Sequence, residues 1–171
     1  AMAYDAARAE VVLFGGLISS AIVAETWVWN GSTWTEREVA APPARYYHAL
    51  AYDAVRGELM LFGGLGYGFF FADTWAWNGS TWTTRAVETE PPARAHHDVA
   101  YDAMRNELVM LSGWSGEALI ADTWVWQYEL PGAVDEACAD PSDADGDGLA
   151  GCADPDCDGV CDPFCLPYTS C

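Results

Sequence analysis

Lysine is absent from the sequence, and the 7 basic residues, all arginine, stand against 26 aspartate and glutamate residues. The formal net charge of -19 repels phosphate backbones and anionic lipid headgroups, so we expect no nucleic-acid partner. Long apolar runs are also absent, since none approaches the roughly 20 residues that a membrane-spanning helix requires. We therefore expect no membrane insertion, and the opening segment AMAYDAARAE carries no export signal of its own.

Cysteine is missing from the sequence before Cys138, and arginine is missing after Arg105. The 6 cysteines and a dense set of aspartates therefore share the end of the chain, while the tryptophans lie before it. These two absences predict a tryptophan-rich body, residues 1–131, and an acidic, cysteine-rich tail, residues 132–171.

The body is built from a sequence repeat. AMAYDAARAEVVLFGG (1–16) returns as ALAYDAVRGELMLFGG (49–64) and as DVAYDAMRNELVMLSG (98–113). AETWVWNGSTWT (24–35) returns as ADTWAWNGSTWT (72–83) and, shortened, as ADTWVW (121–126). The units begin at residues 1, 49 and 98, and this repeat length is typical of arrays of small structural units that pack on one another.

Within one repeat, turn signals separate four short strands, at residues 48–53, 58–62, 74–77 and 81–87. The Asn78-Gly79 pair favours a tight hairpin between the last two. One antiparallel meander cannot bury its own faces, so neighbouring sheets are expected to stack around an axis. The predicted fold is all-β: a partial β-propeller of about three four-stranded meanders, followed by a small, irregular, disulfide-rich tail.

The repeat resembles the kelch motif of bacterial β-propellers. The resemblance rests on the paired glycines at 15–16 and 63–64, the tyrosine upstream, the spaced Trp34 and Trp82, and the Pro-x-Arg segments at 43–45 and 92–94. The third unit departs from it, because Leu-Ser-Gly at 111–113 replaces Phe-Gly-Gly and the last strand is missing. Closed propellers have 4 to 8 blades. We therefore expect the chain to be the C-terminal part of a larger propeller, with upstream blades as its partners and one blade completed by a borrowed strand.

Residues that recur at the same place in every unit are predicted to serve the scaffold. An aspartate and arginine pair at each first hairpin is expected to cap the turn and form an ion pair. Arg45 and Arg94 are expected to bind neighbouring backbone, and His48 and His97 to be structural. The recurring tryptophans are expected to fill the space between sheets. The other recurring positions are Tyr4, Tyr52, Tyr101, Asp5, Asp53, Asp102, Arg8, Arg56 and Arg105.

Binding residues are expected where the units differ, in the connections 17–23, 65–71 and 114–120 and in the links that precede each new unit. These segments carry aromatic side chains suited to a carbohydrate or a protein ligand. In the alternative interpretation, the aromatic residues 69–71 fold inward or cover a neighbouring blade. The predicted ligand-binding residues are Tyr46, Tyr47, Tyr67, Phe69, Phe70 and Trp114.

The kelch resemblance raises catalysis as a separate hypothesis, because kelch propellers include sugar epimerases and also copper carbohydrate oxidases, which have a Cys-Tyr crosslink. The body has no cysteine for such a crosslink, and its histidines are His48, His96 and His97. No nucleophile, base and orienting acid stand in a recognisable arrangement. A carbohydrate-active enzyme that uses upstream blades and a purely structural spacer both remain alternatives to a binding module.

The tail carries a pattern of calcium ligands. Asp143, Asp145 and Asp147 alternate, a glycine follows, and Asp154 stands at the twelfth position counted from Asp143. This spacing resembles the EF-hand calcium loop, although the closing residue is not glutamate and no amphipathic helices flank it. The pattern restarts at Asp154, which is closer to the thrombospondin type 3 repeat. The predicted calcium ligands are Asp143, Asp145, Asp147, Leu149, Asp154, Asp156 and Asp158.

The cysteines of the tail predict three disulfides in any of 15 pairings. Zinc is the competing interpretation, although no C-x-x-C pair occurs. Disulfides require an oxidising compartment, so we expect an extracellular or cell-surface protein. The sequence thus predicts a kelch-propeller binding module with a calcium-binding, disulfide-stapled tail. The cysteines are Cys138, Cys152, Cys157, Cys161, Cys165 and Cys171.

Overall fold

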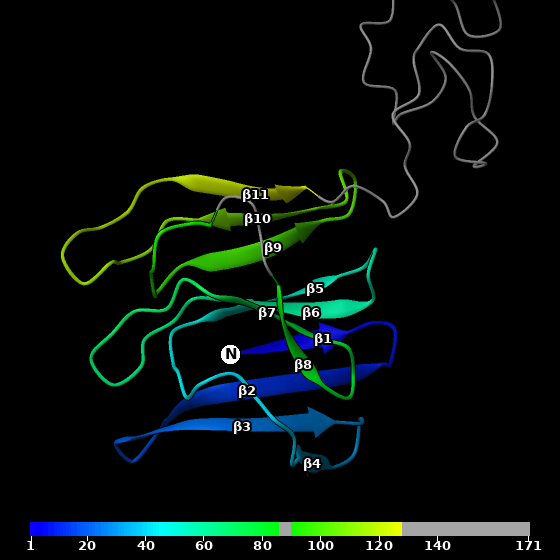
Figure 1. The fold of residues 1–171 in the computed structure, drawn as a ribbon. Coiled ribbons are helices and arrows are strands. Elements are labelled where there is room, and N and C mark those ends of the chain that lie inside the picture. Colours follow the sequence, from blue (N-terminus) through cyan, green and yellow to red (C-terminus); the bar gives the residue numbers. More distant parts are fainter. Residues whose placement is uncertain (86–89, 128–171) are drawn as a thin grey trace, which may run out of the picture. The chain divides into compact units, whose positions relative to one another are not determined.

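Three antiparallel β-sheets form the fold in the computed structural model, which describes residues 1–85 and 90–127 (Figure 1). All three belong to the unit Ala1–Gln127, and no helix occurs within the described ranges. Sheet 1 contains β1 (Met2–Asp5), β2 (Glu10–Ile18), β3 (Ala21–Trp29) and β4 (Trp34–Arg37). Sheet 2 contains β5 (Ala49–Asp53), β6 (Glu58–Phe62), β7 (Thr74–Trp77) and β8 (Trp82–Arg85). The described part of sheet 3 contains β9 (Asp98–Asp102), β10 (Glu107–Leu111) and β11 (Thr123–Gln127).

Each sheet is a meander in which consecutive strands pair, and the prediction of an all-β fold is confirmed. Tyr4 pairs with Val11 in sheet 1 just as Tyr52 pairs with Leu59 in sheet 2, so the sequence repeat is also a repeat of register. Across residues 1–85 and 90–127 no helix is long and apolar enough to span a membrane.

The tight turns follow from local side-chain hydrogen bonds. Asp5 accepts hydrogen bonds from the backbone N–H of Arg8 at 3.2 Å and from its guanidinium at 2.8 Å. Asp53 and Asp102 bind the arginines of their own hairpins in the same way, as predicted. The Oδ1 atom of Asn78 accepts the backbone N–H groups of the two residues that close the next hairpin, at 3.0 and 2.9 Å. These bonds join residues two or three positions apart, so each turn is stabilised by contacts within its own hairpin.

The second connection of sheet 1 differs from the prediction of a variable loop at 17–23. β2 and β3 continue through most of this segment, and Ser19 and Ser20 form the turn with φ angles of 46° and 79°. Two positive φ angles make a hairpin turn whose twist matches that of the strands. In sheets 2 and 3 the corresponding segments are loops, each crossed by one isolated bridge, Leu65 with Phe70 and Trp114 with Leu119.

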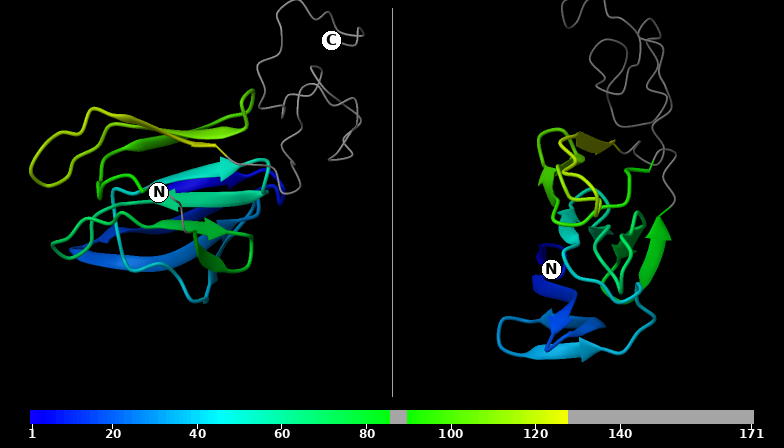
Figure 2. Two further views of the ribbon diagram at one scale, coloured as in Figure 1. Left: turned by 45° about the horizontal axis from the view of Figure 1, so that its top comes forward. Right: turned by 90° about the vertical axis from the view of Figure 1, so that its left-hand side faces the viewer.

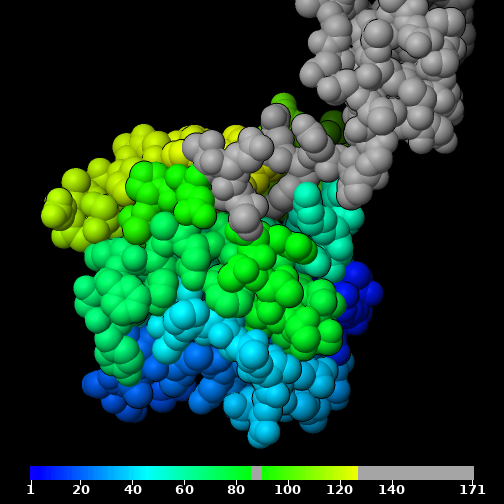
Figure 3. All heavy atoms as spheres, in the orientation of Figure 1, coloured from blue at the N-terminus to red at the C-terminus, as the bar shows by residue number. Residues whose placement is uncertain are grey.

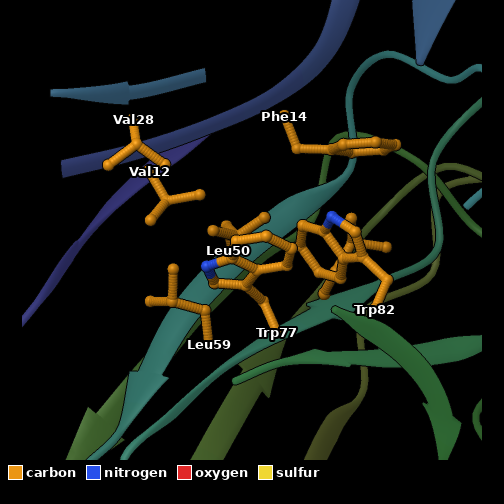
Figure 4. Close-up of a cluster of buried hydrophobic side chains, with 8 residues drawn as sticks. Val12, Phe14, Val28, Leu50, Leu59, Trp77 and Trp82 are labelled. Carbon is orange, nitrogen blue, oxygen red and sulfur yellow. The ribbon is translucent and has the colours of Figure 1, made fainter. Parts of the chain in front are cut away.

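The sheets stack face to face, and the core lies between them. Alternation along the strands places the tryptophans of each sheet on one side, which we call its tryptophan face. The tryptophan face of sheet 2 covers the opposite face of sheet 1, and the indole of Trp82 donates a hydrogen bond to Thr26 Oγ1 at 2.9 Å. The predicted packing role of the tryptophans is thus observed between these sheets (Figure 4). The core residues are Val12, Phe14, Val28, Leu50, Leu59, Leu61, Trp77 and Trp82.

Sheet 3 packs on sheet 2 in the same orientation. The ring of Trp126, on the tryptophan face of sheet 3, lies 5.5 Å from the ring of Phe62 on the opposite face of sheet 2. Phe62 holds the position that Phe14 holds in sheet 1, and both are buried. The structure therefore contains two successive interfaces of one kind.

Candidate functional site

The variable connections gather at one end of the sheets, which we call the loop end. It consists of residues 17–23, 46–47, 65–71, 95–96 and 114–120. The connections after β2, β6 and β10 lie at the left in Figure 1, and the right-hand view of Figure 2 looks onto them. In Figure 3 the blue, green and yellow surfaces on the left belong to these three sheets in turn. The short aspartate-capped hairpins lie at the opposite end.

The links between sheets reach the loop end through backbone pairing. Tyr46 and Leu65 exchange two hydrogen bonds, at 3.0 and 2.8 Å, and Ala95 exchanges two with Trp114 at the same distances. Each link therefore lies beside the second connection of the sheet that it enters. This pairing places the predicted residue Tyr46 next to the loop that carries Tyr67 and Phe69.

A buried arginine anchors each link. Arg45 is fully buried, and its Nε donates to the carbonyl of Pro43 at 3.0 Å while Nη1 donates to the carbonyl of Gly63 at 2.9 Å. Its two terminal nitrogens also bind both carboxylate oxygens of Asp73, at 2.6 and 2.8 Å. The predicted bonding to backbone is confirmed, whereas the carboxylate partner was not predicted. The ring of Phe71 lies under the guanidinium, with the ring centroid 3.7 Å from the Cζ atom of Arg45.

Arg94 repeats this arrangement in the next link. It donates to the carbonyl groups of Pro92 and Ser112 and pairs with both oxygens of Asp122. The hydrogen bond from Arg94, opposed by partial burial, lowers the pKa of Asp122 to about 2. Burial raises the pKa of Asp73, but hydrogen bonds from Arg45 and the neighbouring indole outweigh it and hold that pKa low. Both aspartates are therefore ionised, and their ion pairs lock the loops in place.

Three predicted or neighbouring aromatic rings pack against one another at the end of the links. The ring of Tyr47 lies 4.5 Å from that of Tyr46 and 3.8 Å from that of His96. Tyr47 and His96 hold equivalent positions in the repeat, and both have a positive φ, 55° and 57°. The backbone N–H of His96 donates to the carbonyl of Tyr47 at 3.0 Å. Tyr47 is 51% exposed, so the stack offers an open aromatic surface.

His96 was missed as a member of this surface. The sequence shows it only as one of two adjacent histidines, and nothing local marks its contact with a residue 49 positions earlier. The signal that could have found it is the repeat itself, since Tyr47 and His96 are both aromatic at the same place in successive links.

The loop 65–71 divides its aromatic residues between contact and exposure. Tyr67 is 67% exposed, and its hydroxyl accepts the backbone N–H of Ile22 in sheet 1 at 3.0 Å. Phe69 is also exposed, with its ring edge-on to Phe71 at 4.8 Å. Phe70 is half-buried, and its ring closely approaches Gly116 in the loop of sheet 3. The inward-folding alternative therefore describes Phe70 and Phe71, the latter packed on Arg45, while Tyr67 and Phe69 remain open.

Trp114 occupies the equivalent loop of sheet 3. Its indole is partly exposed, and its backbone is held by the pairing with Ala95. The following turn is closed by Ser115, whose hydroxyl interacts with the backbone of Ala118. Trp114 is thus an exposed aromatic side chain on a fixed backbone.

Two histidines lie beneath the loop end without facing solvent. Burial lowers the pKa of His48 to about 2 and that of His97 to about 4. The Nε2 atom of His97 lies 3.2 Å from the carbonyl oxygen of Phe62. Both are neutral near pH 7 and serve the scaffold, as their recurrence indicates. Within the described part of the chain, no group of three or more His, Cys, Asp or Glu residues could hold a metal ion.

The predicted calcium ligands and disulfide cysteines all lie in 128–171, outside the described residues. What the described geometry offers chemically is a set of open aromatic rings, held by the ion pairs of two buried arginines and without an acid–base pair among them. Comparison of the sequence with protein-family models and with curated proteins found no match.

Proposed function

We propose that this chain is a binding module built from kelch-type propeller blades, with its ligand site at the loop end. Three features support the propeller proposal: the meander repeats in each sheet, successive sheets stack in one orientation, and the links cross at the glycine pairs that carry the kelch resemblance. Gly16 N–H donates to the carbonyl of Arg45, and Gly64 N–H donates to that of Arg94, each at 2.8 Å.

One observation carries the binding proposal: open aromatic side chains share the loop end and stand on backbone that is hydrogen-bonded to its neighbours. Tyr47, Tyr67, Phe69 and Trp114 are all exposed. Exposed aromatic residues on a rigid scaffold bind at low cost in conformational entropy, because few torsions need to be frozen. The recurring tryptophans, by contrast, lie on the strands and belong to packing.

The charge of the chain narrows the ligand. A net charge of -19 disfavours anionic ligands, so an uncharged carbohydrate, whose ring faces pack on aromatic side chains, is the first candidate. A protein is the second candidate, because tyrosine, tryptophan and phenylalanine are enriched in the cores of protein interfaces. An enzyme and a spacer are not favoured by any contact at the loop end.

A neutral-glycan array followed by calorimetric titration tests the proposal. We expect Tyr47→Ala and Trp114→Ala each to weaken binding about tenfold or more, as truncation of a central aromatic contact does. Trp34→Ala is the matched control, because this exposed tryptophan lies on a strand away from the loop end, and it should leave the affinity unchanged. A blank array would refute the carbohydrate ligand, and equal losses in all three variants would refute the location.

For the tail we propose calcium binding and disulfide formation outside the cell, where millimolar calcium suits weak carboxylate sites. Calcium titration of the whole chain should release or absorb heat that is lost in the double variant Asp145→Ala, Asp147→Ala. The absence of heat from both proteins would refute it.

A further inference from the structure

At the ends of the stack formed by sheets 1, 2 and 3, two apolar faces have no cover from residues 1–85 and 90–127. One is the tryptophan face of sheet 1, and the other is the face of sheet 3 opposite its tryptophans. The repeat allows each to be compared with an equivalent face that is covered within the same chain. The comparison identifies what these faces are built to contact.

On sheet 1, Trp34 is 43% exposed, whereas the equivalent Trp82 of sheet 2 is 6% exposed. Met2 is likewise exposed, although the equivalent Leu50 of sheet 2 is buried, and Tyr4 is exposed, whereas the equivalent Tyr52 is partly buried. The side chains at these positions are large and apolar in both sheets, so the difference in their exposed fractions arises because another sheet covers the tryptophan face of sheet 2. Sheet 1 covers the tryptophan face of sheet 2, and within the described ranges nothing covers that of sheet 1 to this extent.

Sheet 3 shows the reverse arrangement. Leu111 is 59% exposed, although the equivalent residues Phe14 and Phe62 are buried by the next sheet. Val125 is exposed, whereas its equivalents Val28 and Ala76 are buried. The exposed face of sheet 3 thus has the same form as the two surfaces that receive a tryptophan face inside the chain.

The polar groups of the interface are also available on the uncovered faces. Between sheets 1 and 2, Trp82 donates to Thr26, and Arg8 donates to the carbonyl of Gly57 at 2.9 Å. Thr123 holds the position of Thr26 on the outer face of sheet 3, and it is exposed. The remaining equivalents are Trp34 as indole donor, Arg105 as guanidinium donor and Ala9 as carbonyl acceptor, the last with a positive φ like that of Gly57.

We infer that two copies of this chain associate head to tail, the tryptophan face of sheet 1 in one copy packing on the outer face of sheet 3 in the other. The interface continues the one that already joins the sheets, with Trp34 of one copy donating to Thr123 of its partner. Such a contact is heterologous, so it closes only if the rotation per sheet completes a ring. Two copies bring six sheets together, within the 4 to 8 of closed propellers.

Sedimentation velocity of the 171-residue chain, from about 1 to 100 µM, tests the inference. We expect a concentration-dependent species of twice the monomer mass, stabilised by added salt because salt screens repulsion between chains of charge -19. Trp34→Glu and Leu111→Glu should each shift the protein to monomer, and Tyr4→Glu provides a second variant of the first face. Thr83→Glu, at an exposed position on β8 of the central sheet and outside both faces, is the control and should leave association unchanged.

Mixing the two blocked variants distinguishes head-to-tail contact from other self-association. Trp34→Glu retains an intact sheet 3 face, and Leu111→Glu retains an intact sheet 1 face. An equimolar mixture should therefore form a one-to-one complex, while either variant alone stays monomeric. A monomeric wild-type chain, or variants whose mixture does not associate, would overturn the inference. Glycan binding at the loop end is measured separately, so neither result depends on the other.

Discussion

Replacement of Trp82 by alanine tests whether the tryptophan faces hold the sheets together. The indole of Trp82 lies 5.1 Å from the ring of Phe14 and donates to Thr26 on the neighbouring sheet. Burying a tryptophan removes about 150 to 250 Å² from water, which at about 25 cal/mol per Å² stabilises the fold by about 4 to 6 kcal/mol. Because unfolded chains already bury part of this surface, we expect the free energy of unfolding to fall by about 3 to 5 kcal/mol.

Two further variants separate the contributions. Trp82→Phe keeps most of the ring but leaves the buried Thr26 hydroxyl without its donor, which costs about 1 kcal/mol in addition to the lost ring area. Trp34→Ala changes the same residue type at the equivalent position of sheet 1. Because Trp34 is partly exposed, its loss should cost about half as much or less in dilute solution, where copies do not associate.

Urea unfolding, followed by tryptophan fluorescence and by circular dichroism, gives these differences at constant m-value. The eight other tryptophans leave enough signal in either single variant. Equal losses for Trp82→Ala and Trp34→Ala would refute the reasoning, because cover by sheet 1 would then contribute nothing. A loss below about 1 kcal/mol for Trp82→Ala would do the same.

Three other substitutions give outcomes of known direction. Arg94→Ala should destabilise the chain by about 2 to 4 kcal/mol in urea, because it removes a fully buried side chain and leaves two carbonyl groups without their donor, whereas the exposed Arg105→Ala should cost less than about 1 kcal/mol; similar losses would contradict this. Burial keeps the pKa of His97 near 4, so the unfolded chain binds more protons between pH 6.5 and 4, and stability should fall as pH decreases by about 1.4 kcal/mol per unit for this residue. His97→Gln should reduce that slope, and an unchanged slope would exclude His97 as its source. Gly63→Ala should lower the melting temperature more than Gly31→Ala, because both have a positive φ but only the Cβ at Gly63 would lie 2.6 Å from a carbonyl oxygen; equal shifts would disprove the steric argument.

The strands could be predicted from the sequence because their ends are encoded locally. Asp53 caps one hairpin and Asn78 another through bonds to residues two or three positions away. The pairing of Arg45 with Asp73 joins residues 28 positions apart, and no local sequence pattern predicts it. The repeat does contain the signal, because arginine and aspartate recur together at this separation in the next unit.

The departures from prediction have equally specific causes. The hairpin at 17–23 depends on positive φ angles at Ser19 and Ser20. Glycine at these positions would have indicated such a turn, but serine does not. The third unit has Ser112 where the second has Gly63. A Cβ at Gly63 would meet the carbonyl of Arg94 in the link that crosses it, whereas the described residues place no such link against Ser112. The contact of Tyr47 with His96 arises only when two sheets come together.

The two roles of Arg45 bear on how such a chain could lengthen. Its side chain binds the sheet that follows it, through Asp73, while its carbonyl binds the sheet before it, through Gly16. A repeat unit copied in tandem therefore carries both sets of groups that form the next junction: the arginine of the link, and the aspartate and glycine that bind its side chain and its carbonyl. Gene duplication could then add a sheet that meets its neighbours through contacts already present, while the loops at the loop end differ from one unit to the next.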